Sequence, residues 1–183
     1  MIARRVRELN IYCEIFPYNK APKNIENFKG LILSGSPFSV HDVEAPSVNL
    51  EEFKNIPILG ICYGAQMVAK ISGCDVLKSE IREYGRAKLN YVNNSSLILD
   101  GVKSNSDVWM SHGDSIKNNK DVLEVIASTN DVEVASYYIK KLNFYGLQFH
   151  PEVTHSAEGK KILENFTVKI CGCNKKWTPD KFV

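Results

Sequence analysis

One cysteine of this chain lies between two glycines, in the stretch "GICYG" at residues 60–64. A buried-strand pattern, "IPILGI", leads into Cys62 and helix-forming residues follow it, so the thiol is expected at a sharp strand-to-helix turn. Unsatisfied N–H groups at the start of a helix favour the thiolate, which is the nucleophilic form of cysteine. The pattern therefore predicts a nucleophile elbow, in which Gly60 and Gly64 are required because a Cβ at either position would collide with its neighbours.

A thiol nucleophile needs a base, and the chain has four histidines: His41, His112, His150 and His155. The first and the last lie in polar loops, where exposure is expected. His150 directly follows the apolar strand "FYGLQF", and Pro151 fixes the turn after it. Glu152 comes next, so its carboxylate could fold back onto the imidazole and hold its tautomer. Because Cys62 also follows a strand, both groups are expected at the carboxyl edge of one sheet.

Each of these residues also has an ordinary structural interpretation. A free cysteine is more often a small buried residue than a nucleophile, and a histidine at a strand end is more often a satisfied hydrogen-bonding group. Cys171 and Cys173 form one C-x-C pair, which supplies too few ligands for structural zinc, so no metal site is predicted. The odd number of cysteines, five, and the lack of a signal-peptide pattern indicate reduced thiols in a cytoplasmic protein.

The elements that would position the candidate residues are visible as apolar runs separated by turn signals. Helical spacing predicts three helices, over residues 2–9, 63–72 and 157–170. Gly73 follows the second of these as a helix stop. Short apolar or alternating runs predict strands at 11–16, 31–34, 56–61, 87–92, 107–112, 122–129, 132–139 and 144–149.

This order predicts an α/β fold with an open, mostly parallel twisted sheet flanked by helices, and with additional antiparallel strands in the second half. A length of 183 residues fits one domain, which we expect to span residues 1–172, with 173–183 as a linker. A net charge of +2 and the lack of an apolar run of ~18 residues give no indication of a nucleic-acid or membrane partner. Such a sheet usually begins with a strand, whereas this chain begins with a helix, so either the first strand is missing or the fold starts in an unusual way.

The motifs "GICYGAQ" and "QFHPE" together resemble those of the class I, or triad-type, glutamine amidotransferases. Three more stretches, "SGSP" at 34–37, "REYG" at 82–85 and "WMSHGD" at 109–114, resemble the amidotransferase domains of GMP synthases in particular. The likeness runs in order over nearly the whole chain. It implies the flavodoxin-like fold of that family, without the N-terminal strand and Gly-Ser-Gln-rich loop that precede its first helix.

The resemblance also implies roles for the candidate residues. Cys62 would attack the side-chain amide of glutamine to form a γ-glutamyl thioester, and ammonia would leave. His150 would act as general base and acid, with Glu152 orienting it. The oxyanion hole would use the backbone N–H groups of Tyr63 and Ser36. The family has Gly-Gly-Pro where this chain has "GSP" at 35–37, so the Cβ of Ser36 is expected to restrict the backbone there.

The remaining family residues map onto this chain as contacts to glutamine. By resemblance, these glutamine-binding residues are Gly35, Gln66, Ser111, His112, Gly113 and Asp114. Taken alone, Gln66 reads as an ordinary residue of a first helical turn, and the stretch 111–114 reads as a tight turn after a strand. No cofactor is expected for the glutaminase step. ATP and Mg²⁺ would bind a partner ATP-pyrophosphatase domain or subunit, to which residues 173–183 would lead.

Three functions remain open at this point. The resemblance favours the glutaminase part of a GMP synthase, which would supply ammonia to convert xanthosine monophosphate to GMP on the synthetase partner. A second possibility is an enzyme of the same fold in another pathway, or a γ-glutamyl hydrolase. A third is a non-catalytic, amidotransferase-like module that regulates a partner. The presence of Cys62, His150 and Glu152 together argues against the third, because a binding module has no need of all three.

Overall fold

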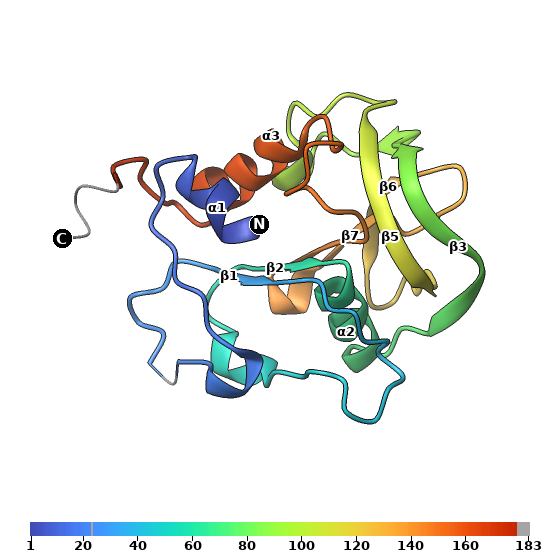
Figure 1. The fold of residues 1–183 in the computed structure, drawn as a ribbon, viewed down its shortest axis with the longest axis horizontal. Helices are drawn as coiled ribbons and strands as arrows, with labels where there is room; N and C mark the ends of the chain where they lie inside the picture. The colour runs from blue at the N-terminus through green and yellow to red at the C-terminus, as the bar shows by residue number, and fades with distance from the viewer. Residues whose placement is uncertain (23, 179–183) are drawn as a thin grey trace.

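The structure, a computed structural model, describes residues 1–22 and 24–178, and the side chains of residues 79–83 lie outside this description. A six-stranded sheet forms the centre of the molecule (Figure 1). In spatial order its strands are β1 (Leu31–Leu33), β2 (Ile58–Ile61), β8 (Phe144–Leu147), β7 (Ser136–Ile139), β6 (Glu124–Ser128) and β4 (Tyr91–Val92). A separate antiparallel ribbon is formed by β3 (Val76–Lys88) and β5 (Asp107–Ile116).

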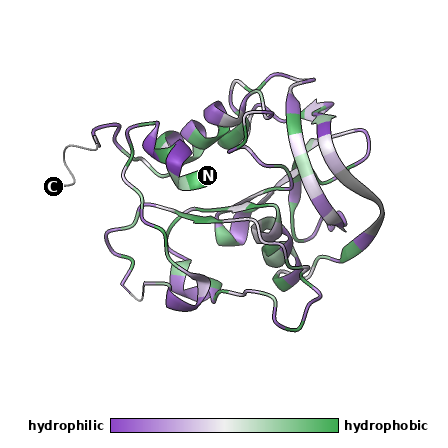
Figure 2. Ribbon diagram, viewed as in Figure 1, coloured by the Kyte–Doolittle hydropathy of each residue, from purple (hydrophilic) through white to green (hydrophobic). Residues whose placement is uncertain are grey.

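Helices cover both faces of the sheet. The α-helices are α1 (Ile2–Arg7), α2 (Tyr63–Ile71) and α3 (Gly159–Glu164), and α3 continues as a π-helix over Asn165–Ile170. Short 3-10 turns occur at Tyr18–Lys20, Leu50–Phe53, Leu97–Leu99 and Lys140–Leu142. Figure 1 shows α1 and α3 on one side of β1 and β2, and α2 on the other side. Helices α1 and α3 carry both hydrophilic and hydrophobic residues along their turns (Figure 2), as expected when one face of a helix is buried.

Side-chain alternation along β2 divides the core into two clusters. Ile58 packs in the cluster under α2, whereas Leu59 and Ile61 pack in the cluster under α1 and α3. All three side chains are at most 1% exposed. A strand buried on both faces explains why "ILGI" is a continuous apolar run without polar alternation.

The predicted α/β fold class is confirmed, but the sheet is not mostly parallel as expected. The pairs β1–β2 and β2–β8 are parallel, and the other three pairs of the six-stranded sheet are antiparallel. The sheet is therefore mixed, and its parallel part is limited to the strands next to the elbow. Helix α2 ends where predicted, because Gly73 follows it with a φ of +96°.

The strand predicted at 11–16 is wrong. These residues contain no regular element, and the Cys13 carbonyl accepts a hydrogen bond from Arg7 rather than from a neighbouring strand. Among the described residues no strand lies on the outer side of β1, which forms one edge of the sheet. An apolar segment without a partner cannot form ladder hydrogen bonds, whatever its β propensity.

One other boundary differs from the prediction. The predicted strand at 87–92 is divided between the end of β3 and the start of β4. The predicted linker lies against the domain as far as Trp177, whose backbone N–H donates to the Asn10 carbonyl at 2.9 Å. Residues 179–183 of that linker lie outside the described residues, and the boundary at 172 stays a prediction. None of the described helices is long and apolar enough to cross a bilayer.

Candidate active site

Cys62 lies at the corner between β2 and α2, as the sequence predicts. Its backbone has φ of 50° and ψ of −107°, a conformation that residues with a side chain rarely adopt. The Cys62 N–H donates to the Leu147 carbonyl of β8 at 2.7 Å, and the Cys62 carbonyl accepts from the Gln66 N–H of α2 at 3.0 Å. The strained corner is therefore held from both sides, by the next strand of the sheet and by the helix that the cysteine begins.

The two flanking glycines are required by close packing. A Cβ on Gly60 would lie 2.7 Å from the Ala65 nitrogen and 2.5 Å from the Phe144 ring. A Cβ on Gly64 would lie 2.5 Å from the Leu33 carbonyl oxygen of β1. Real Cβ atoms do not approach backbone atoms this closely, so the predicted collision at both positions is confirmed.

We expect Gly64→Ala to destabilise the protein by about 2 kcal/mol, because the new methyl group meets backbone of β1 that cannot move aside cheaply. Thermal or urea denaturation would measure the loss. Gly113→Ala is the matched control, since a Cβ on Gly113 meets nothing within 4 Å and its φ is not positive. Equal stability of the two variants would contradict the packing argument.

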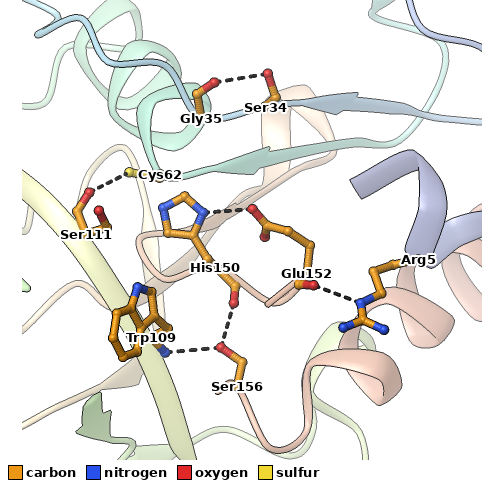
Figure 3. Close-up of polar contacts among 9 residues, drawn as sticks. All are labelled: Arg5, Ser34, Gly35, Cys62, Trp109, Ser111, His150, Glu152 and Ser156. Atoms are coloured by element: carbon orange, nitrogen blue, oxygen red, sulfur yellow. Dashed lines mark hydrogen bonds and ion pairs between the residues drawn. The ribbon is translucent and has the colours of Figure 1, made fainter. Parts of the chain in front are cut away.

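His150 and Glu152 form a hydrogen-bonded pair directly after β8. The His150 Nδ1 and Glu152 Oε1 atoms are 2.8 Å apart, and the two side chains are 17% and 10% exposed. Figure 3 shows the imidazole between Cys62 and Glu152, with the carboxylate on the side away from the sulfur. The geometry brings together the three residues that the sequence predicts to be catalytic.

The environment of His150 favours its protonated form. Burial alone would lower the pKa of the imidazole, but hydrogen bonds and charge interactions with Cys62 and Glu152 outweigh burial and raise the pKa to about 10. At neutral pH the site can therefore hold a proton on His150 between the sulfur and the carboxylate. A thiolate next to an imidazolium is the reactive form of a cysteine nucleophile.

The loop after β1 covers this group. An ideal Cβ on Gly35 would lie 3.2 Å from the His150 Cε1 atom and 3.8 Å from the Cys62 Cβ, so the bare backbone of Gly35 is next to both. On the other side, the Cys62 thiol lies 3.6 Å from the Ser111 carbonyl oxygen of β5. Two residues predicted to bind glutamine, Gly35 and Ser111, thus flank the nucleophile.

Ser36 has a backbone conformation that its Cβ allows, which is consistent with the expected restriction. It is not among the residues with positive φ, and its hydroxyl accepts a hydrogen bond from the Phe38 N–H at 3.3 Å. The following residues anchor the loop: Ser39 Oγ donates to Asp114 Oδ2 at 2.6 Å, and Lys70 Nζ donates to the Val40 carbonyl at 2.6 Å. Serine is therefore accommodated where the family has glycine. The roles of the Tyr63 and Ser36 N–H groups as oxyanion donors stay predictions.

Residues 111–114 lie inside strand β5, so the alternative interpretation as a tight turn is wrong. Gln66 Nε2 donates to the Asp114 carbonyl at 2.8 Å, and the His112 ring nitrogen Nδ1 lies 2.9 Å from the same oxygen. His112 is 4% exposed, and burial lowers its pKa. This buried cluster ties α2 to β5. The binding of glutamine by Gln66, Ser111, His112, Gly113 and Asp114 stays a prediction.

The two remaining histidines lie outside this group of residues. His41 and His155 are exposed, as predicted, although His41 Nε2 also lies 2.7 Å from the Val76 carbonyl oxygen. Among the side chains that the structure describes, no group of three or more from His, Cys, Asp and Glu is arranged to hold a metal ion.

Three residues next to the site were not found from the sequence. Arg5 of α1 reaches the backbone of Glu152, while Trp109 and Ser156 hold the backbone of His150 (Figure 3). The sequence patterns assign this role to none of them. Their contacts depend on how α1, β5 and the loop before α3 pack together, and no local pattern reports this.

A cysteine activated by a histidine–carboxylate pair is the arrangement of enzymes that react through a thioester. Comparison with known proteins agrees with this class. The chain belongs to the class-I glutamine amidotransferase family, and the sequence model of that family matches residues 1–170.

Among its relatives are GMP synthases of the glutamine-hydrolyzing type. The proteins of Cytophaga hutchinsonii and Christiangramia forsetii are 54% and 50% identical to this chain, in alignments of 184 positions that cover all of it. The chain spans 36% of the length of each. A crystal structure of a candidate GMP synthase component from Thermoplasma acidophilum has a TM-score of 0.82 at 33% identity, covering 93% of this chain and 86% of that one.

Proposed function

We propose that this chain is the glutaminase part of a GMP synthase. Cys62 attacks the side-chain amide carbon of glutamine, the C–N bond breaks, and ammonia leaves with a proton from His150. Water then hydrolyses the γ-glutamyl thioester and releases glutamate, with His150 acting as base. Glu152 holds the imidazole in the required orientation. The observation that carries this proposal is the single line of contacts from Cys62 through His150 to Glu152 at one sheet edge.

The nucleotide part of the reaction would take place outside this chain. The relatives named GMP synthase are about three times longer than the chain, which leaves room in them for a synthetase part. By this proposal, ATP and Mg²⁺ bind the ATP-pyrophosphatase partner, which activates xanthosine monophosphate for attack by ammonia. The glutaminase step itself uses no cofactor. We also propose a cytoplasmic location, where glutamine and purine nucleotides are present together.

The coupling between the two parts gives a direct test. We expect the isolated chain to hydrolyse glutamine slowly, and the rate to rise at least about 10-fold when the synthetase part, ATP and xanthosine monophosphate are added, because shielded ammonia transfer requires both sites to be engaged. Glutamate release would be measured with and without each component. Equal rates for the chain and the complex would refute the coupling.

A second measurement separates an enzyme from a regulatory module of the same fold. Diazo-oxonorleucine, an electrophilic analogue of glutamine, should modify Cys62 and leave the other four cysteines unmodified. Mass spectrometry of the intact and digested chain would locate the label. A folded sample that binds the synthetase part but is not labelled at Cys62 would favour the regulatory module.

A further inference from the structure

The backbone of His150 is fixed to strand β5. The His150 N–H donates to the Trp109 carbonyl at 2.9 Å. The Ser156 hydroxyl donates to the His150 carbonyl at 2.5 Å and accepts from the Trp109 N–H at 3.1 Å. Figure 3 shows the two bonds of the Ser156 hydroxyl, to the His150 carbonyl and from the Trp109 N–H. The position of the histidine therefore depends on β5 and on the loop that precedes α3.

Glu152 is held differently. Its Oε1 atom contacts the His150 imidazole, while its Oε2 atom is buried and has no hydrogen-bond partner in the described structure. The carboxylate is therefore not anchored by a second donor that would fix its orientation. The backbone carbonyl of Glu152 instead accepts a hydrogen bond at 2.9 Å from Nε of Arg5, a residue of α1 that lies 147 positions earlier in the chain.

The side chain of Arg5 is also held by a second contact close to it in sequence. Its NH1 atom lies 2.9 Å from Glu8 Oε2, within the same helical region, and its side chain is 30% exposed. Helix α1 packs on the core through Val6, and Leu9 just after the helix is buried with it; the two are 3% and 4% exposed. Arg4, the adjacent residue, also pairs with Glu8, but its side chain is 82% exposed and makes no described contact with Glu152. The guanidinium of Arg5 is thus already held in place. Its bond to the Glu152 carbonyl therefore costs little additional side-chain entropy.

We propose that Arg5 is a positioning residue that holds the Glu152 backbone so that its carboxylate meets His150 Nδ1. The proposal rests on the proposed glutaminase function, in which the His150–Glu152 pair is catalytic. Without Arg5 the Glu152 carbonyl loses its fixed donor, and the loop can relax away from α1. Small displacements of an orienting group lower the rate of the chemical step more than they lower substrate binding.

The experiment compares Arg5→Met with the matched control Arg4→Met in the full chain. We expect Arg5→Met to lower kcat for glutamine hydrolysis about 10-fold with KM within about 2-fold, and to move the alkaline limb of the pH profile to lower pH. The limb moves because a weaker bond to Glu152 makes the imidazolium easier to deprotonate. Arg4→Met should change neither quantity. Arg5→Lys should recover most of the rate, because its ammonium can still donate to the carbonyl.

Equal kcat values in Arg5→Met and Arg4→Met, or an unchanged alkaline limb in a slower Arg5→Met, would overturn the proposal. Circular dichroism would establish that each variant is folded. Arg5→Leu, which also has no hydrogen-bond donor and for which the same fall and shift are expected, replaces Arg5→Met if the latter does not fold.

A failure of the proposed function would be seen separately. Alkylation of Cys62 by iodoacetamide as a function of pH requires only the thiol and its histidine, and not recognition of glutamine. A wild-type chain that does not hydrolyse glutamine would refute the function. The alkylation profile of Arg5→Met would still decide whether Arg5 positions the pair, since an unchanged profile would overturn that role.

Discussion

Replacing Cys62 by alanine is expected to lower the rate of glutamine hydrolysis by at least about 10⁴-fold, since no other group at the corner can form the thioester. The variant should remain folded, because alanine is smaller than cysteine and leaves the contacts of Gly60 and Gly64 unchanged. Glutamate release and labelling by diazo-oxonorleucine would both be measured. Both signals are expected to disappear together.

Cys13→Ala is the matched control for this variant. Cys13 is a half-buried thiol whose sulfur lies 3.5 Å from the Ala3 carbonyl. Burial raises its pKa, so it is a poor nucleophile at neutral pH. Its replacement should leave the hydrolysis rate unchanged. Residual turnover near the wild-type level in Cys62→Ala would show that the chemistry lies elsewhere.

Replacing Glu152 by glutamine is expected to lower kcat by about 10³- to 10⁴-fold, because the amide neither stabilises the imidazolium nor enforces the tautomer that the reaction needs. The pH profile should change as well. In the wild type the pKa of His150 is raised to about 10, so activity that needs the imidazolium persists until the pH approaches that value. Loss of the carboxylate lowers this pKa, so the alkaline limb should move to lower pH.

Glu158→Gln is the matched control, because Glu158 is a glutamate of the same loop region that pairs with Lys161 at 3.8 Å rather than with His150. We expect this surface pair to contribute little and the pH profile to be unchanged. An alkaline limb that stays in place in Glu152→Gln would mean that the carboxylate does not set the protonation of His150.

The local sequence determined the centre of the site. Gly60, Cys62 and Gly64 follow a strand pattern directly and open a helix pattern, and such a corner has few possible backbone geometries. His150 likewise follows a strand, and Glu152 is close enough in sequence for its carboxylate to reach the imidazole. Short-range constraints of this kind are set by backbone sterics and chain connectivity, so they can be predicted from one sequence.

Other features depended on which segments became neighbours. The segment 11–16 has strand propensity but forms no strand, because no described strand lies beside it to pair with. Residues 111–114 contain a glycine and an aspartate and resemble a turn, yet pairing with β3 keeps them within β5. Propensity is a weak preference that a hydrogen-bonded neighbour, or the lack of one, overrides.

The sequence by itself thus determined that Cys62, His150 and Glu152, the proposed nucleophile, base and orienting carboxylate, come together, since each lies within a few positions of a strand end. Only the tertiary structure decided what holds them in place. The bond from Arg5 to Glu152 joins residues 147 positions apart, and the bonds of Trp109 and Ser156 to His150 span two further elements. Such contacts arise from the packing of helices and strands around a common core, and no local pattern of residue types encodes them.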